Sequence, residues 1–144
     1  MPVPPGCGRG RDSRIFGGMK PTIDGSRAPV FVIRWPVEIE PQEVRQHIDE
    51  MREIVRGQRA AFVLDLTESG VPDAKLRKLV ASELQSAFAE LGDQVAGVCH
   101  VVASPIIRGM MTAVYWLAPP PFETMTTSDL DAAVVWAKKR LSRA

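Results

Sequence analysis

The order of the apolar segments constrains the fold more than any other feature of this chain. Short apolar runs at 30–35, 60–66 and 95–102 alternate with helical patterns at about 41–56, 73–91 and 105–117. Short apolar runs bounded by turn residues are typical of strands buried on both faces. Strands that alternate with helices are joined by right-handed crossovers, so this order predicts a mostly parallel sheet with helices on its faces.

Capping residues support the segment boundaries toward the C-terminus. Ser104 followed by Pro105 predicts a helix start, because serine caps free amides and proline loses no needed donor at the first position. A last strand is expected at 122–125. The last helix is expected to begin with a capping box between Ser128 and Asp131.

The length of 144 residues favours a single hydrophobic core. Residues 1–14 are rich in proline, glycine and arginine, which predicts a flexible tail. Residues 15–144 are expected to form one α/β domain. We expect a sandwich with a small, mostly parallel central sheet of about four or five strands and about four helices. An antiparallel N-terminal edge strand is expected within 15–24.

Composition disfavours several classes of function. A net charge of +1 gives no electrostatic reason to bind nucleic acid or an anionic membrane. Cys7 and Cys99 lack the spacing of a zinc or redox motif, so we expect no metal, no cofactor and no disulfide. No apolar stretch is long enough for a signal peptide or a membrane span, which predicts a cytoplasmic protein.

Polar side chains follow the predicted strands at the points where these strands end. In sheets of this kind, ligands and partners bind outside the carboxyl ends of the strands. We therefore expect a binding edge that contains Asp65, Thr67, Ser69, Ser104 and Thr126.

The helix at 105–117 carries an unusually wide apolar band that extends around to Tyr115 and Trp116. Three interpretations of this band stay open: a pocket for an acyl chain, a homodimer patch, or packing under the turn at 119–121, with Trp136 nearby. At the start of the same helix, Ser104 and Arg108 can hold a phosphate or carboxylate.

No complete catalytic set is evident, so we expect a protein that is not an enzyme. Asp65 is unlike a phosphoacceptor, because the preceding strand ends in Arg34 and Trp35 without the acidic pair that holds magnesium. His100 has no acidic partner in sequence and is expected to be a hydrogen-bonded core or edge histidine. His47 is expected to be a partly exposed helix residue.

Three segments carry a resemblance to a known family: the strand 62–66, the stretch 108–117, and the ending 122–125 followed by 130–136. Together with the order of the elements, they resemble the STAS-like domains of small bacterial proteins, which include anti-sigma-factor antagonists and CRAL-TRIO-like proteins. The resemblance implies a domain that works by docking to a regulator. Its phosphorylated serine has no counterpart in 71–75, where Asp73 supplies either a fixed negative charge or a helix cap.

We therefore expect a cytoplasmic binding or regulatory domain that docks to another protein or to a second copy. The docking surface would combine the carboxyl edge of the sheet with the helix at 105–117. The alternative is a small carrier for a lipid or another amphipathic anion. In that case Arg108 would bind the head group, and Met110, Met111, Tyr115 and Trp116 would line the tail site.

Overall fold

The structure is a computed structural model that describes residues 20–143. The predicted tail at 1–14 and residues 15–19 of the predicted edge strand lie outside the described residues. The strands of the described part are β1 (Thr22–Arg27), β2 (Val30–Arg34), β3 (Ala60–Asp65), β4 (Val95–Val101) and β5 (Thr124–Thr127). The helices are α2 (Pro41–Val55), α3 (Ala74–Leu91), the short 3-10 helix η1 (Gly92–Gln94), α4 (Pro105–Leu117) and α5 (Leu130–Leu141).

These strands form one sheet in the order β1-β2-β3-β4-β5, in which β1 is antiparallel to β2 and the other pairs are parallel. The predicted α/β architecture with an antiparallel N-terminal edge strand is confirmed. Ile33 is paired with Leu64, Leu64 with His100, and His100 with Thr126. Paired residues of neighbouring strands share a face, so this row of side chains crosses one face of the sheet.

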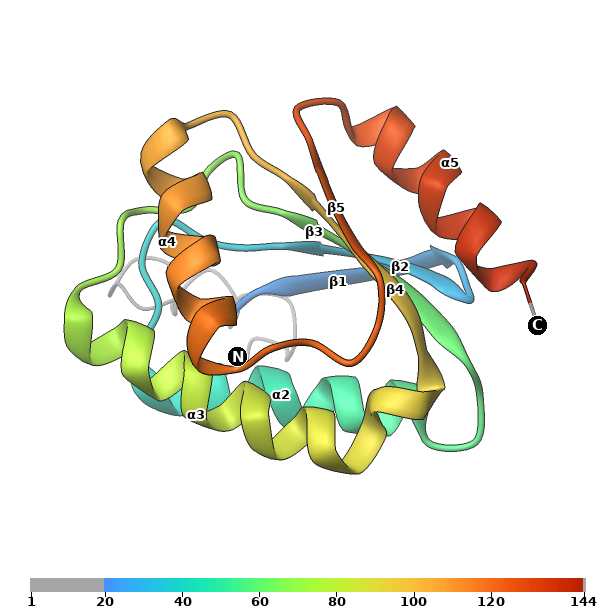
Figure 1. The fold of residues 1–144 in the computed structure, drawn as a ribbon, viewed down its shortest axis with the longest axis horizontal. Helices are drawn as coiled ribbons and strands as arrows, with labels where there is room; N and C mark the ends of the chain where they lie inside the picture. The colour runs from blue at the N-terminus through green and yellow to red at the C-terminus, as the bar shows by residue number, and fades with distance from the viewer. Residues whose placement is uncertain (1–19, 144) are drawn as a thin grey trace, which may run out of the picture.

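The two faces of the sheet are covered differently (Figure 1): α5 lies on one face, and α2, α3 and α4 lie on the other. The α5 face is built from small side chains, so the helix packs close to the strands; they include Ala61, Gly97, Cys99, Ala133 and Ala137. The opposite face, under α2, α3 and α4, carries the larger side chains of Ile33, Phe62, Leu64 and His100.

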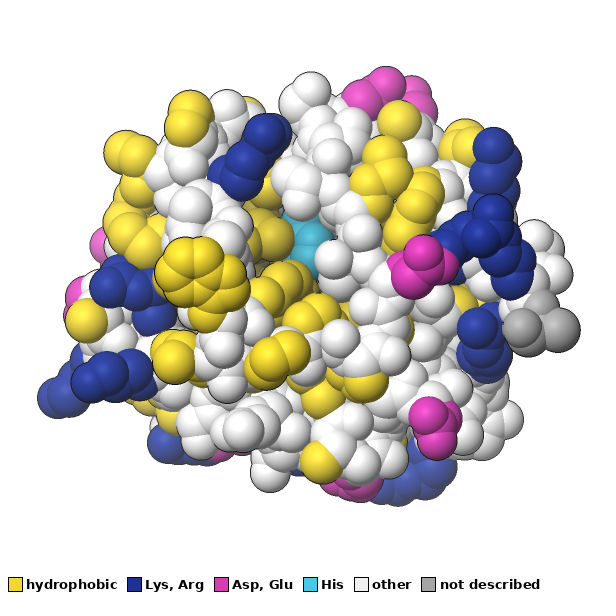
Figure 2. All heavy atoms as spheres, in the orientation of Figure 1, with side chains coloured by type: hydrophobic (Ala, Val, Ile, Leu, Met, Phe, Trp, Pro, Cys, Tyr) yellow, Lys and Arg dark blue, Asp and Glu magenta, His cyan; other side chains and the backbone are white. Residues whose placement is uncertain are grey.

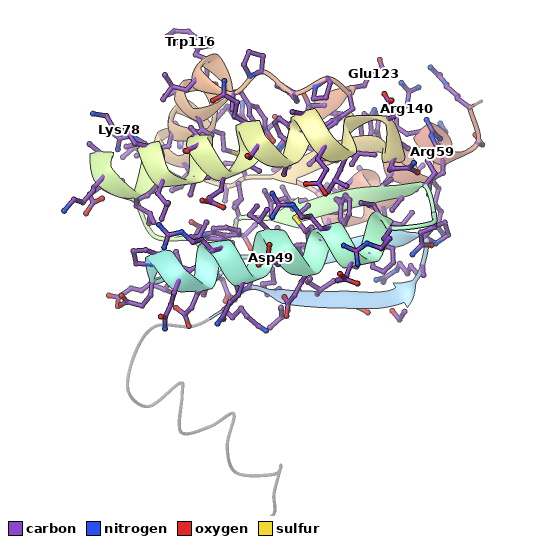
Figure 3. The ribbon with its side chains drawn as sticks, turned by 90° about the horizontal axis from the view of Figure 1, so that it is seen from below. Asp49, Arg59, Lys78, Trp116, Glu123 and Arg140 are labelled. Carbon is purple, nitrogen blue, oxygen red and sulfur yellow. The ribbon has the colours of Figure 1, made fainter. Side chains whose placement is uncertain are left out.

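A group of charged residues closes the α5 side at one end of the molecule, where Figure 3 shows Arg59, Glu123 and Arg140 close together. The buried Arg140 forms an ion pair with Glu123, and its guanidinium lies 5.5 Å from the ring centroid of Trp136. Nη1 of Arg59 donates to the carbonyl oxygen of Arg143 at 3.2 Å. The basic residues at the end of α5 therefore take part in structural contacts there.

Three local predictions were wrong. Within the described residues, the edge strand spans 22–27 and so ends beyond the predicted position 24, and the last strand spans 124–127 instead of 122–125. Phe122 precedes this strand because its ring packs edge-on against Phe88 of α3, with centroids 5.1 Å apart. The cap of α5 is Asp129 and not Ser128, since the Asp129 carboxylate accepts the N–H of Asp131 at 2.9 Å.

Candidate functional site

A cavity of about 170 Å³ lies between the sheet and the layer formed by α2, α3 and α4. Its walls are almost entirely apolar. Leu64 belongs to the central strand, yet it is only partly buried. The same holds for apolar side chains that α3 and α4 turn toward the sheet; these are Leu76, Val80, Leu84, Met110, Met111 and Val114. The helices therefore do not close completely onto the strands.

Local sequence signals position the helices that roof this cavity. The carboxylate of Asp73 accepts the N–H of Leu76 at 2.8 Å and caps α3, whereas the Ser104 hydroxyl caps α4 by accepting from Ile106 and Ile107. Side-chain caps of this kind stabilise a helix by about 1 kcal/mol. Asp73 and Ser104 thus set where α3 and α4 begin, and with that which side chains face the cavity.

A second, shallower space of about 230 Å³ adjoins the cavity between α4 and β5, and we call it the mouth groove. The cavity and the groove share His100, Met111 and Tyr115. The groove is completed by Arg108, Thr112, Trp116, Thr124 and Thr126. Figure 2 shows this hollow between α4 and β5, with a histidine side chain at its bottom among hydrophobic ones. An apolar cavity thus lies next to a groove that carries hydroxyl groups and one guanidinium.

His100 and Tyr115 form a hydrogen-bonded pair where the cavity meets the groove. The Tyr115 hydroxyl lies 2.6 Å from Nε2 of His100, and Nδ1 of His100 lies 3.4 Å from the carbonyl oxygen of Met125. Burial lowers the pKa of His100 to about 4 and raises the pKa of Tyr115 well above its ordinary value. Both groups are therefore neutral at physiological pH. The expectation of a hydrogen-bonded core histidine at position 100 is confirmed.

The second histidine also faces the cavity, contrary to the prediction that His47 is partly exposed. Its side chain is buried, with only 2% of the residue exposed, and its ring packs edge-on against Trp35 at 5.4 Å between centroids. Burial lowers the pKa of His47 to about 4, so the imidazole is neutral. Its Nδ1 has no hydrogen-bond partner.

Arg108 is the cationic side chain of the mouth groove. None of the ion pairs among residues 20–143 includes it. A guanidinium without an internal carboxylate partner, beside the hydroxyls of Thr124 and Thr126, offers charge-assisted hydrogen bonds to an anion. The groove therefore has the chemistry of an anion-binding rim.

The polar residues predicted at the carboxyl edge are engaged in local structure. The Asp65 carboxylate accepts the N–H and the hydroxyl of Thr67 at 3.0 and 2.7 Å, and Nε of Arg34 at 3.3 Å. Burial works to raise the pKa of Asp65, but these hydrogen bonds outweigh it and the pKa is lowered. The Ser69 hydroxyl donates to the carbonyl oxygen of Gly70 at 2.9 Å. The hydrogen bonds between Asp65 and Thr67 thus stabilise the loop after β3.

The predicted residues divide into two groups. Arg108, Tyr115 and Trp116 meet Thr126 at the mouth groove, and Ser69 lines the cavity. Asp65 and Thr67 stabilise a loop, while Asp73 and Ser104 cap helices. Trp116 is 80% exposed and points away from the sheet (Figure 3), so it does not pack under the turn at 119–121. The prediction that Trp136 lies near it is wrong, because Trp136 packs on the opposite face of the sheet.

His47 and His100 were not predicted as site residues. Their positions carry a signal, since His47 falls within the apolar stripe that includes Val44, Ile48 and Met51. His100 alternates with Val98 along its strand. A polar residue on an apolar face can equally be a satisfied core residue, and only the cavity beside both rings distinguishes the two cases.

Two further features are absent from the described residues. In the stretch 20–143, no three side chains of histidine, cysteine, aspartate or glutamate lie close enough together to hold a metal ion. No helix in the described part of the chain combines the length and the apolar character needed to cross a membrane.

No protein-family model matches the chain, and no curated protein matches it. Among solved structures, it is similar to an uncharacterized protein of the DUF3478 family with a SpoIIAA-like fold from Shewanella loihica PV-4. The match covers 83% of this chain and 94% of the other, with a TM-score of 0.55 and 14% sequence identity. The chain therefore has a SpoIIAA-like, that is, STAS-like, α/β fold, as the resemblance implied.

Proposed function

We propose that the protein is a binding protein for a small amphipathic anion, with the apolar body of the ligand in the cavity and its anionic group in the mouth groove. The observation that carries the proposal is that the two spaces adjoin. The apolar cavity and the groove that contains Arg108 share His100, Met111 and Tyr115 in their walls. This was the alternative expectation from the sequence, and the cavity favours it over protein docking.

The size of the cavity limits the ligand body. An apolar protein cavity of about 150 Å³ accommodates a benzene-sized molecule, whereas drug-sized ligands need roughly 300–1,000 Å³. The cavity of about 170 Å³ lies near the lower figure. The proposed ligand therefore has a short chain or a single ring and is much smaller than a phospholipid.

The polarity of the two spaces orients the ligand. An ionised carboxylate is costly to place in an apolar interior without a partner. His100 and Tyr115 supply no positive charge, because both are neutral and are bonded to one another, and the Arg77 guanidinium of the cavity wall already donates to the carbonyl oxygen of Pro72. The anionic group is therefore expected to stay in the mouth groove, within reach of Arg108, Thr124 and Thr126.

Octanoate is a suitable probe, and its affinity for the wild-type protein can be measured by isothermal titration calorimetry. Arg108→Gln should weaken binding roughly 10- to 100-fold, because hydrogen bonds to charged groups contribute about 1.5–3 kcal/mol. Met111→Trp should abolish binding, since Met111 lines both spaces and a larger side chain would fill the region where they adjoin. Lys78→Gln is the matched control, because Lys78 is an exposed cation that lines neither space.

Equal affinities for wild type, Arg108→Gln and Met111→Trp would contradict the proposed site. Absence of any octanoate binding to the wild-type protein, together with unchanged amide shifts in its NMR spectrum, would contradict the proposed ligand class.

A second candidate function, the docking of a protein partner, is favoured by the outer face of α4. Ile106, Trp116 and Leu117 are 60, 80 and 57% exposed, and exposed apolar clusters are common at interaction sites. Sedimentation velocity tests whether this partner is a second copy. In that case Trp116→Glu should abolish concentration-dependent dimerisation, whereas Val135→Glu on α5, which is 53% exposed, should not. A monomer at every concentration would exclude self-association.

A further inference from the structure

We propose that the ligand carries a second polar group, a neutral hydroxyl or carbonyl, at the far end of its apolar body, and that His47 is its hydrogen-bonding partner. This inference rests on the proposed function and specifies the class of the ligand. The proposed ligand has an anionic group at one end, an apolar middle, and an uncharged hydrogen-bonding group at the other end.

The observation that points to this group is an unpaired polar atom on a side chain that lines the cavity. Among the described residues, two buried side-chain nitrogens lack a hydrogen-bond partner: Nδ1 of His47 and Nε of Arg140. Arg140 belongs to the opposite face of the sheet, where it contacts Trp136 and Glu123. His47 lines the cavity, and only 2% of the residue is exposed. An unpaired buried group costs about 1–3 kcal/mol, which a ligand group bonded to Nδ1 would offset.

Four other polar side chains of the cavity wall already have partners. Tyr115 and His100 are bonded to each other, and the Ser69 hydroxyl is bonded to a backbone carbonyl. Nη1 of Arg77 donates to the carbonyl oxygen of Pro72 at 2.9 Å and lies 3.2 Å from the sulfur of Met110. Among the described residues of the cavity wall, His47 is therefore the side chain that holds a fully buried polar atom without a partner.

The chemistry of His47 selects a neutral group. Its imidazole is uncharged, so it cannot compensate the charge of a second carboxylate. A neutral imidazole presents either an N–H donor or a lone pair at Nδ1, depending on the tautomer. A hydroxyl suits both tautomers, and a carbonyl suits the one that donates.

The topology indicates the length of the ligand body. His47 packs against Trp35, which directly follows β2, whereas His100 lies on β4. β3 separates these strands, so crossing from one to the other takes two strand spacings, or roughly 10 Å. The ligand body must therefore be an extended chain of at least this length.

Octanoate and 8-hydroxyoctanoate form a matched pair of probes that differ by one hydroxyl group. With the wild-type protein, we expect 8-hydroxyoctanoate to bind roughly 3- to 10-fold more tightly, as one hydrogen bond of about 0.5–1.5 kcal/mol would produce. His47→Phe should retain octanoate binding but bind 8-hydroxyoctanoate less tightly than octanoate. His47→Gln should keep the preference for 8-hydroxyoctanoate, because glutamine also donates and accepts hydrogen bonds. Arg108→Gln should weaken both ligands equally and leave their ratio unchanged.

A measurement on the wild-type protein keeps the test independent of how the variants fold. The ¹⁵N resonance of His47 Nδ1 should shift with 8-hydroxyoctanoate and not with octanoate. If octanoate binds and the hydroxylated probe binds no more tightly, this inference is wrong and the proposed function stands; a water molecule held by His47 would give that result. If neither anion binds, the proposed function fails and this inference fails with it.

Discussion

The phenolic oxygen of Tyr115 lies 2.6 Å from Nε2 of His100, and this hydrogen bond joins α4 to β4 beneath the mouth groove. The other ring nitrogen of His100 lies 3.4 Å from the carbonyl oxygen of Met125 on β5. A buried imidazole is thus held from two sides, by a helix and by the edge strand. The pair therefore sets the separation of the two elements that form the groove.

Replacing Tyr115 by phenylalanine tests this relationship. Tyr115→Phe keeps the ring but leaves a buried nitrogen of His100 without a partner, so it should lower the free energy of unfolding by about 1–3 kcal/mol. Urea denaturation followed by circular dichroism gives this quantity. The control is Trp116→Phe at the next position, which is 80% exposed and should change stability by less than about 0.5 kcal/mol. Similar losses in both variants would contradict a specific role for the bond.

Stability should fall when the pH decreases from about 6.5 to about 4. Burial lowers the pKa values of His47 and His100 from 6.5 to about 4, so within this window the unfolded chain binds protons that the folded chain does not. Each histidine then lowers the free energy of unfolding by about 1.4 kcal/mol per pH unit, and by up to about 3 kcal/mol per histidine over the whole window. Above pH 6.5, neither histidine should contribute to the pH dependence.

Urea titrations at several pH values measure this slope. His47→Phe should roughly halve it between pH 4 and 6, because one of the two buried histidines is then absent. A stability that stays constant from pH 7 to 4 would show that the histidines are not buried in their neutral form.

Two glycines provide a matched test of the close packing on the α5 face. A Cβ at Gly97 would lie 2.8 Å from the Trp136 ring and 3.0 Å from Cγ of Arg140, so Gly97→Ala should destabilise the protein by about 1–3 kcal/mol. A Cβ at Gly109 in α4 would meet no atom within 4 Å. Gly109→Ala should therefore stabilise the protein by about 0.5–1 kcal/mol through helix propensity. In thermal denaturation, the midpoint temperature should fall for Gly97→Ala and rise for Gly109→Ala.

Asp65 and Asp73 differ in what their carboxylates do. Asp65→Asn should cost about 1–3 kcal/mol, since it removes the charge that receives Arg34 and places an amide beside the Thr67 N–H. Asp73→Asn should be nearly neutral, because asparagine caps a helix about as well as aspartate. Chemical denaturation distinguishes the two. An Asp65→Asn variant as stable as the wild type would mean that the carboxylate is not needed to hold the loop after β3.

Much of the fold was predictable because its signals are local. The runs around Ile33, Leu64 and Val98 are too short and too apolar for exposed helices, and they form adjacent strands of one sheet. The bounds of α4 were predicted from Ser104 and Pro105, whose capping chemistry is independent of the rest of the chain. The start of α5 was misplaced by one residue because Ser128 and Asp129 are both good caps, and tertiary packing chose between them.

The site was predictable only in part. The sequence by itself determined which residues form strands and helices. It also determined that the helix at 105–117 has more apolar surface than one interface needs. Both properties depend on neighbours within a few positions of the chain. Only the tertiary structure decided that α2, α3 and α4 leave a cavity between themselves and one face of the sheet. This arrangement brings His47 and His100 to the cavity wall and Arg108 to the adjoining groove. A cavity is a property of distances between elements far apart in the chain, and no local pattern encodes it.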